Sequence, residues 1–124
     1  MRWIVDGMNV IGSRPDGWWK DRRGAMARLV DRLERWATTE GRSVQVVFES
    51  PVSPPIESAV IDIANAPEAA ANSADDEIVR LVTSDSRPAD ITVVTSDSTL
   101  AERVRAAGAS VHAAAGFRRL IDPD

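Results

Sequence analysis

The chain begins with a short segment that is apolar without interruption. Trp3, Ile4 and Val5 lack the alternation of polar and apolar residues that a half-exposed strand shows. Such runs are typical of central strands in parallel sheets, because helices cover both faces of those sheets. The run ends at Asp6, a carboxylate at the carboxyl end of a strand, where open α/β sheets bind ligands. Gly7 follows, and we expect it to allow a tight backbone turn.

The rest of the chain alternates between segments with strand and helix patterns. The predicted strands cover residues 43–48, 60–64, 91–95 and 109–113, and the predicted helices cover residues 22–39, 73–82, 99–107 and 116–121. We expect the short strand 60–64 to lie at an edge of the sheet and residues 65–73 to form a loop. The order β-α-β-β-α-β-α-β predicts an α/β fold: one Rossmann-like, three-layer α/β/α domain over residues 1–124, with a mostly parallel sheet.

The composition restricts the kind of metal site that is possible. The chain has no cysteine and one histidine, His112, which excludes disulfides, thiolate sites and zinc sites with several imidazoles. A metal would therefore have oxygen ligands, which favours Mg²⁺ or Mn²⁺. The net charge of -4 argues against a module that holds nucleic acid by bulk electrostatics. We see no signal peptide and no membrane-spanning run, so we expect a cytoplasmic protein without a membrane partner.

Acidic residues stand at the carboxyl ends of three predicted strands. They are Asp6, Glu49 and Asp97, and Asp75 or Asp76 opens a helix that should start on the same side of the sheet. Clustered carboxylates repel one another unless a cation neutralises them, so this arrangement favours metal-assisted hydrolysis of a phosphodiester. The alternative is ordinary capping and turn chemistry, because acids are favoured in the first turn of a helix and Asp-Gly in turns.

Three short motifs resemble a known family. They are the Asp-Gly-x-Asn of residues 6–9, the Ala-Asp of residues 74–75 that opens a helix, and the Thr-Ser-Asp of residues 95–97 that ends a strand. Together they are similar to NYN domains, most of all to the YacP-like branch of the PIN-like ribonuclease superfamily, from residue 2 to about residue 117. The resemblance implies a metal-dependent endoribonuclease with a PIN-like fold. When the motifs are matched by position, the resemblance implies a catalytic site formed by Asp6, Asn9, Asp75 and Asp97, with Ser96 supporting them.

From these residues we expect a particular metal site. Asp6, Asp75 and Asp97 would be the ligands, with Glu49 as an outer ligand and Asp76 as the alternative to Asp75. Asn9 would orient a phosphate oxygen or a metal-bound water. Many relatives have a further acid at the position of Ser98, which argues against a fully populated two-metal site.

The loop before the first long helix is the expected substrate side. It contains two adjacent tryptophans, which either cover the core or stack on bases. We expect the substrate-binding residues to be Trp18, Lys20, Arg22, Arg23, Ser96 and Ser98. Asp21 is the predicted N-cap of the helix that follows.

The expected partner is RNA, on its own or within the ribosome or another RNA-processing assembly. The protein is expected to be a monomer, or a homodimer paired through the edge strand. Two other functions stay open: a non-catalytic PIN-like module that binds RNA or protein, and a phosphatase acting on small molecules, because Rossmann-like sheets host many functions.

Overall fold

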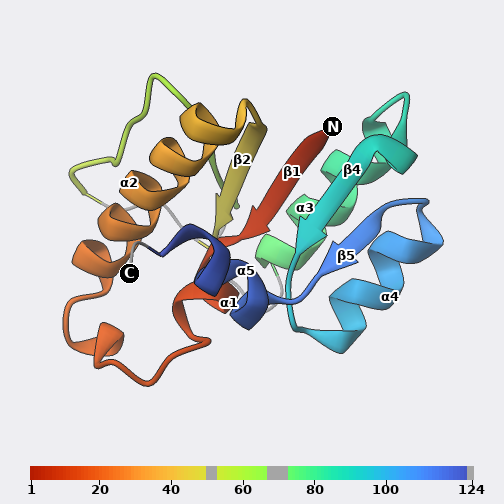
Figure 1. The fold of residues 1–124 in the computed structure, drawn as a ribbon. Coiled ribbons are helices and arrows are strands. Elements are labelled where there is room, and N and C mark those ends of the chain that lie inside the picture. The colour runs from red at the N-terminus through yellow and green to blue at the C-terminus, as the bar shows by residue number, and fades with distance from the viewer. Residues whose placement is uncertain (50–52, 67–72, 123–124) are drawn as a thin grey trace.

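The computed structural model describes residues 1–49, 53–66 and 73–122, and their strands form one five-stranded sheet (Figure 1). The strands lie in the order β3-β2-β1-β4-β5, and every described pair is parallel. The sheet expected to be mostly parallel is therefore parallel throughout these strands, with β1 at its centre. In chain order the strands are β1 (Arg2–Asp6), β2 (Ser43–Phe48), β3 (Asp62–Asn65), β4 (Ile91–Val94) and β5 (Ser110–His112).

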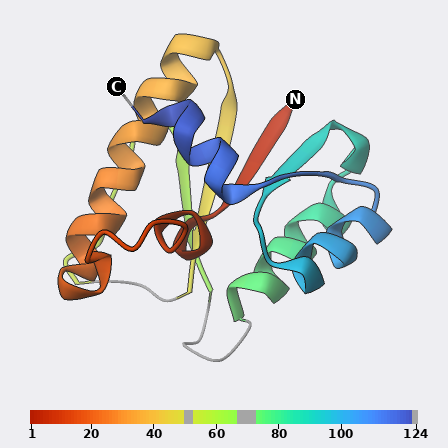
Figure 2. The same cartoon turned by 60° about the horizontal axis from the view of Figure 1, so that its bottom comes forward.

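Helices cover both faces of the sheet (Figure 2). One face carries α1 (Gly7–Ile11), α2 (Arg22–Glu40) and α5 (Ala114–Ile121), and the other carries α3 (Ser73–Ser84) and α4 (Ser98–Ala106). Two short 3₁₀ helices complete the described elements, η1 (Trp18–Lys20) and η2 (Pro88–Asp90). The predicted three-layer α/β/α fold is confirmed. Of the helices in the described part of the chain, none is both long and apolar enough to cross a membrane.

The first strand contributes side chains to both halves of the core, as its sequence predicts. Trp3 and Val5 pack with α2 and α5, whereas Ile4 packs with α3 and α4. Trp3 meets the rings of Trp36, at 5.1 Å, and Phe117, at 5.7 Å between ring centroids. The helix predicted over residues 22–39 buries an apolar face, which includes Met26, Leu29, Val30, Leu33, Trp36 and Ala37.

The strand order creates a crevice beside β1. The chain moves outward from β1 to β2 and β3, then crosses to the other side of β1 to form β4 and β5. The carboxyl ends of β1 and β4 therefore border a topological switch point, which is where open α/β sheets bind ligands. Asp6 ends β1, and Asp97 follows β4 by three residues.

Several local expectations were wrong or shifted. Residues 7–11 form the helix α1 instead of a tight turn. Strand β3 begins at Asp62, two residues later than expected, although it does lie at a sheet edge; helix α5 begins two residues early, at Ala114. The expected loop over residues 65–73 falls largely on residues 67–72, outside the described residues, while Asn65 ends β3 and Ser73 opens α3.

The glycine after Asp6 is required by packing. A Cβ atom on Gly7 would lie 2.5 Å from the Cε1 atom of Phe48 and 3.1 Å from a methyl group of Val46. Both of these neighbours on β2 are fully buried, so their side chains have little room to move. A glycine at this position lets α1 start directly against the sheet.

Replacing Gly7 with alanine should lower the free energy of unfolding by about 1–3 kcal/mol, because the added methyl group overlaps the Phe48 ring. Urea denaturation measures this change. Gly116→Ala is the matched control: its Cβ would lie 3.5 Å from a ring carbon of His112, an ordinary contact inside α5. That variant should be neutral or stabilising by up to about 1 kcal/mol. Equal destabilisation by both substitutions would contradict the packing argument.

Candidate active site

A cleft of about 340 Å³ opens at the switch point between β1 and β4. Its walls come from segments far apart in the sequence: the end of β1, α1, η1, the starts of α2 and α3, and the residues after β2 and β4. Four carboxylates reach it: the three at predicted strand ends, and one from the start of α3. The lining residues are Asp6, Met8, Asn9, Trp18, Arg22, Glu49, Ala74, Asp75 and Asp97.

Asp6 is the most deeply placed of these acids, with 6% of its surface exposed. Burial raises the pKa of its carboxyl group to about 6, and the hydrogen bond from Thr95 opposes this shift while the charges of Asp75 and Asp97 add to it. The Thr95 hydroxyl donates to Asp6 Oδ2 at 3.0 Å. An acid with these properties sits where negative charge is costly, which is typical of functional sites.

The hydroxyl of Thr95 connects two acids of the cleft. Besides donating to Asp6, its oxygen accepts the backbone N–H of Asp97 at 3.1 Å. The Asp97 side chain in turn caps α4, because its Oδ1 atom accepts the backbone N–H of Leu100 at 3.0 Å. Thr95 belongs to the Thr-Ser-Asp motif, but the sequence did not indicate its role. The available signal was a hydroxyl residue at the end of a buried strand, two residues before an acid.

The two adjacent acids of α3 point to different places. Asp75 lines the cleft, and burial raises the pKa of its carboxyl group, with a further contribution from the charge of Asp97. Asp76 instead pairs with Arg103 of α4, at 3.0 Å between Oδ1 and the guanidinium, and it is not among the lining residues. Of the two candidates left open by the sequence, Asp75 is the one that reaches the cleft.

Asn9 is held by a backbone group, and this fixes which of its atoms is free. Its Oδ1 atom accepts the N–H of Ser96 at 2.8 Å. Because a backbone N–H can only donate, the amide NH₂ group of Asn9 is the end that remains to donate in the cleft. Ser96 is itself fixed, since its hydroxyl oxygen accepts the N–H of Ala114 at the start of α5, at 2.9 Å.

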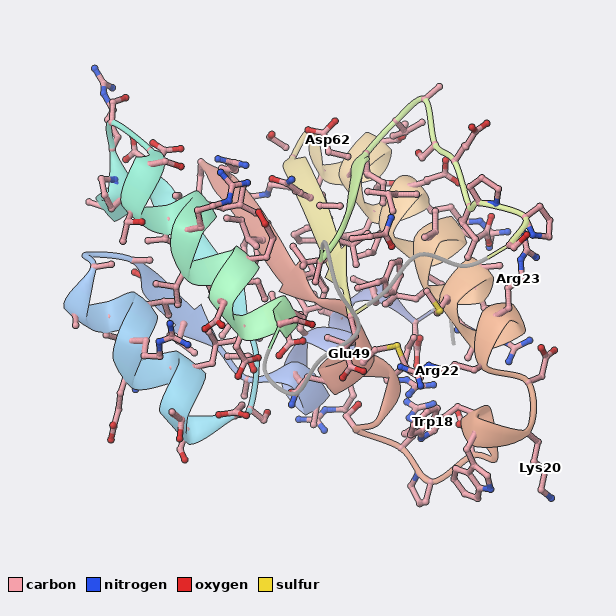
Figure 3. The ribbon with its side chains drawn as sticks, turned by 180° about the vertical axis from the view of Figure 1, so that it is seen from behind. Trp18, Lys20, Arg22, Arg23, Glu49 and Asp62 are labelled. Atoms are coloured by element: carbon pink, nitrogen blue, oxygen red, sulfur yellow. The ribbon has the colours of Figure 1, made fainter. Side chains whose placement is uncertain are left out.

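The expected substrate side divides into residues that reach the cleft and residues that do not. Trp18 and Arg22 line it together with Glu49, and Figure 3 shows these three labelled side chains in one region of the molecule. Lys20 projects away from this group, and Arg23 donates to the carbonyl oxygen of Pro54 at 3.1 Å. Ser98 opens α4 as an exposed residue outside the lining.

The two tryptophans of η1 have different environments. Trp18 packs against the hydrophobic core from its place in the cleft wall. Trp19 is 57% exposed and meets Trp18 edge to face, with ring centroids 5.9 Å apart. Trp18 therefore helps to cover the core, and Trp19 presents an aromatic surface to solvent.

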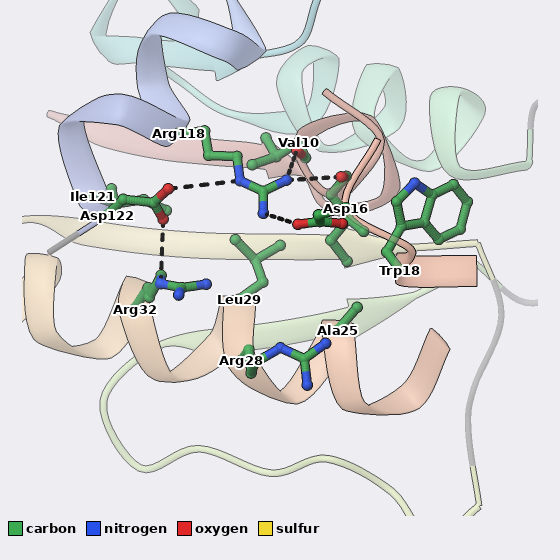
Figure 4. A pocket seen from close by; sticks show the side chains of 11 residues that line it. Val10, Asp16, Trp18, Ala25, Arg28, Leu29, Arg32, Arg118, Ile121 and Asp122 are labelled. Atoms are coloured by element: carbon green, nitrogen blue, oxygen red, sulfur yellow. Dashed lines mark hydrogen bonds and ion pairs between the residues drawn. The ribbon is translucent and has the colours of Figure 1, made fainter. Parts of the chain in front are cut away.

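The loop that leads to Trp18 is anchored by Arg118 of α5 (Figure 4). The Arg118 guanidinium donates to the carbonyl oxygen of Ile11 at 2.9 Å, at the end of α1, and to Asp16 at 2.8 Å. Asp122 lies on the other side of this guanidinium, 3.8 Å away, and pairs with Arg32 of α2 at 3.2 Å. Sequence reasoning missed this anchor, because the order of residues gives no sign that α5 lies against the loop.

The donor set of the cleft fits a divalent cation that keeps most of its waters. All candidate ligands are oxygen atoms, the ligands that Mg²⁺ and Mn²⁺ prefer. Across the described residues, however, no three acids are grouped closely enough to form a complete metal-binding set. Mg²⁺ is commonly held by one or two carboxylates together with water, which is compatible with this spacing.

Comparison with known proteins identifies relatives of the whole chain. The family model of the YacP-like NYN domain matches residues 3–123. The crystal structure of Rae1 (YacP) from Bacillus subtilis superposes with a TM-score of 0.80 at 24% identity, over 98% of this chain and 73% of that one. A tryptophan-to-leucine mutant of that protein gives 0.81 at 23% identity, over 97% and 74%. These likenesses establish the fold. No curated protein matches the chain significantly.

Asp6→Asn should stabilise the protein near neutral pH. The raised pKa means that the folded state favours the protonated carboxyl, so ionised Asp6 costs stability above about pH 6, and this cost fades as the pH falls from about 6 toward 3.8. We expect the variant to gain about 2–3 kcal/mol at about pH 8 and nothing near pH 4. Chemical denaturation at both pH values measures the difference. A gain of the same size at both would contradict the assigned cause.

Proposed function

The chain belongs to the family of YacP-like NYN domains, and from this we propose that it is a metal-dependent endoribonuclease that hydrolyses RNA phosphodiester bonds in the acidic cleft. Domains of this family are of the ribonuclease type. The observation that carries the proposal is the gathering of four carboxylates around one cleft at the switch point. Their mutual repulsion, together with the burial of Asp6, makes the cleft unfavourable for negative charge unless a cation binds there.

In this proposal the cation is Mg²⁺ or Mn²⁺, held by Asp6, Asp75 and Asp97 directly or through water. When bound, it would supply a polarised water and would stabilise the charge that develops on the phosphate oxygens. The protein contributes the fixed orientation of the acids. Thr95 holds Asp6 and the backbone of Asp97, and the cap of α4 holds the Asp97 side chain.

Asn9 has a separate role in the proposal, as a hydrogen-bond donor to the phosphate. Its carbonyl oxygen is engaged by Ser96, so the amide NH₂ group is the end that can bind a non-bridging phosphate oxygen. A donor aimed at an oxygen that gains negative charge lowers the barrier because it is already oriented before reaction. This orientation favours phosphate binding over metal ligation by the Asn9 carbonyl oxygen.

A second candidate is a domain of the same family that binds RNA without cutting it. The observation in its favour is the spacing of the acids, since among the described residues no three form a complete metal-binding group. Cleavage assays separate the two candidates directly.

We expect the wild-type protein to cut a single-stranded or a structured RNA in Mg²⁺ or Mn²⁺, and Asp6→Asn and Asp97→Asn to lose at least about 100-fold in rate. Asparagine keeps the acceptor for Thr95 at position 6 and the helix cap at position 97, so both variants should stay folded. Asp76→Asn is the matched control, because Asp76 lies outside the cleft, and it should retain activity. A wild-type protein that binds RNA but cuts neither substrate would favour the non-cutting domain.

Asn9→Asp should lower kcat/KM by about 100-fold, the usual effect of losing one oriented donor in a catalytic site. The carboxylate can still accept the Ser96 N–H, but it replaces the donor with a negative charge that repels phosphate. Steady-state cleavage kinetics measure the loss, and an unchanged melting temperature shows that the fold is intact. Activity close to that of the wild type would remove Asn9 from the mechanism.

A further inference from the structure

An exposed ion pair joins two residues of the cleft wall. The guanidinium of Arg22, at the start of α2, lies 3.0 Å from the carboxylate of Glu49, which follows β2 (Figure 3). The side chains are 50% and 54% exposed, so water and ligands have access to both. Exposed pairs of this kind contribute little to stability. The pair can therefore open at small cost.

The formation of α2 does not account for Arg22. The N-terminus of a helix carries a partial positive charge, so a cation in the first turn is unfavourable there. The helix is already capped by Asp21, whose carboxylate accepts the N–H of Gly24 at 3.0 Å. The neighbouring Arg23 has a different contact, the carbonyl oxygen of Pro54. Arg22 is thus a cation in an unfavourable helix position that faces the cleft.

The charge balance of the cleft gives Arg22 a role in binding. Among the described residues that line the cleft, it is the only cation beside four carboxylates. A phosphate that approaches these acids is repelled unless a positive group offsets them. A guanidinium suits this purpose because it can donate two parallel hydrogen bonds to a phosphate.

We propose that Arg22 is the phosphate-binding residue of the cleft and that Glu49 occupies its guanidinium in the free protein, so that an RNA phosphate binds by displacing Glu49. This inference rests on the proposed function. It assigns Glu49 to Arg22 and takes it out of the expected set of metal ligands. Glu49 thus lowers the affinity for RNA, and it prevents anions that bind only weakly from occupying the Arg22 guanidinium.

The first test compares Glu49→Gln with the wild type in RNA binding without metal. Fluorescence anisotropy with a short single-stranded RNA in EDTA measures the Kd. We expect Glu49→Gln to bind roughly twofold to fivefold more tightly, the range that corresponds to an exposed ion pair. Asp31→Asn is the matched control: it makes the same charge change and also releases an arginine, Arg35 at 3.0 Å, on the surface of α2 outside the cleft. It should leave the Kd unchanged.

The second test places the effect on Arg22. Arg22→Ala should weaken RNA binding. It should also reduce the slope of log K against log salt concentration by about 1, the amount expected for the loss of one phosphate contact. In the Arg22→Ala background, Glu49→Gln should then have no further effect, because the two residues act as a pair. An equal gain from Glu49→Gln with and without Arg22 would show a general charge effect and overturn the proposal.

Two further outcomes would overturn it. Weaker or unchanged RNA binding by Glu49→Gln shows that Glu49 does not compete with phosphate. A large increase in the Mn²⁺ concentration needed for half-maximal cleavage, without a gain in RNA affinity, shows that Glu49 is a metal ligand. Failure of the proposed function gives a different result. A wild-type protein that neither binds nor cuts RNA removes the proposed function on which this inference rests. RNA binding without cleavage leaves the binding test of Arg22 intact.

Discussion

The hydrogen bond from the Thr95 hydroxyl to the Asp6 carboxylate joins the ends of β1 and β4, the two strands between which the strand order reverses. Both partners are buried, so the bond is made away from competing water. The oxygen of the same hydroxyl accepts the backbone N–H of Asp97, the N-cap residue of α4, and so holds the start of that helix. One side chain thereby fixes the position of two acids and a helix, and the acidic cleft depends on it.

Much of the fold follows from local pattern, but several contacts at the cleft do not. The apolar spacing of α2 and the continuous apolar run of β1 each predict their element, because burial decides those positions. The helix α1 was missed because Asp-Gly and Asn are also common in turns, and Phe48, which packs against Gly7, is about 40 residues away in sequence. Asp75 and Asp76 could not be separated either, because adjacent helical residues point about 100° apart and the rotation of α3 is set by tertiary packing.

The convergence of acids was predictable from topology, whereas their environments were not. Parallel strands end at one edge, so Asp6, Glu49 and Asp97 had to approach one another. The sequence does not reveal that Glu49 meets a guanidinium while Asp6 is enclosed by the core. Carboxylates with the same chemistry therefore lie in different electrostatic environments, Asp6 in the core beside other acids and Glu49 at the surface beside a guanidinium.

The Arg118 anchor has a consequence for how this domain can diverge. Asp16 and the carbonyl oxygen of Ile11 must both reach one guanidinium, which sets the length of the loop that leads to Trp18. Insertions or deletions in this loop would break the anchor, whereas substitutions at exposed positions such as Trp19 leave it intact. The surface of the cleft wall can therefore change by point mutation more readily than by changes in loop length, and any change in that length must also keep the contacts of the loop with α5.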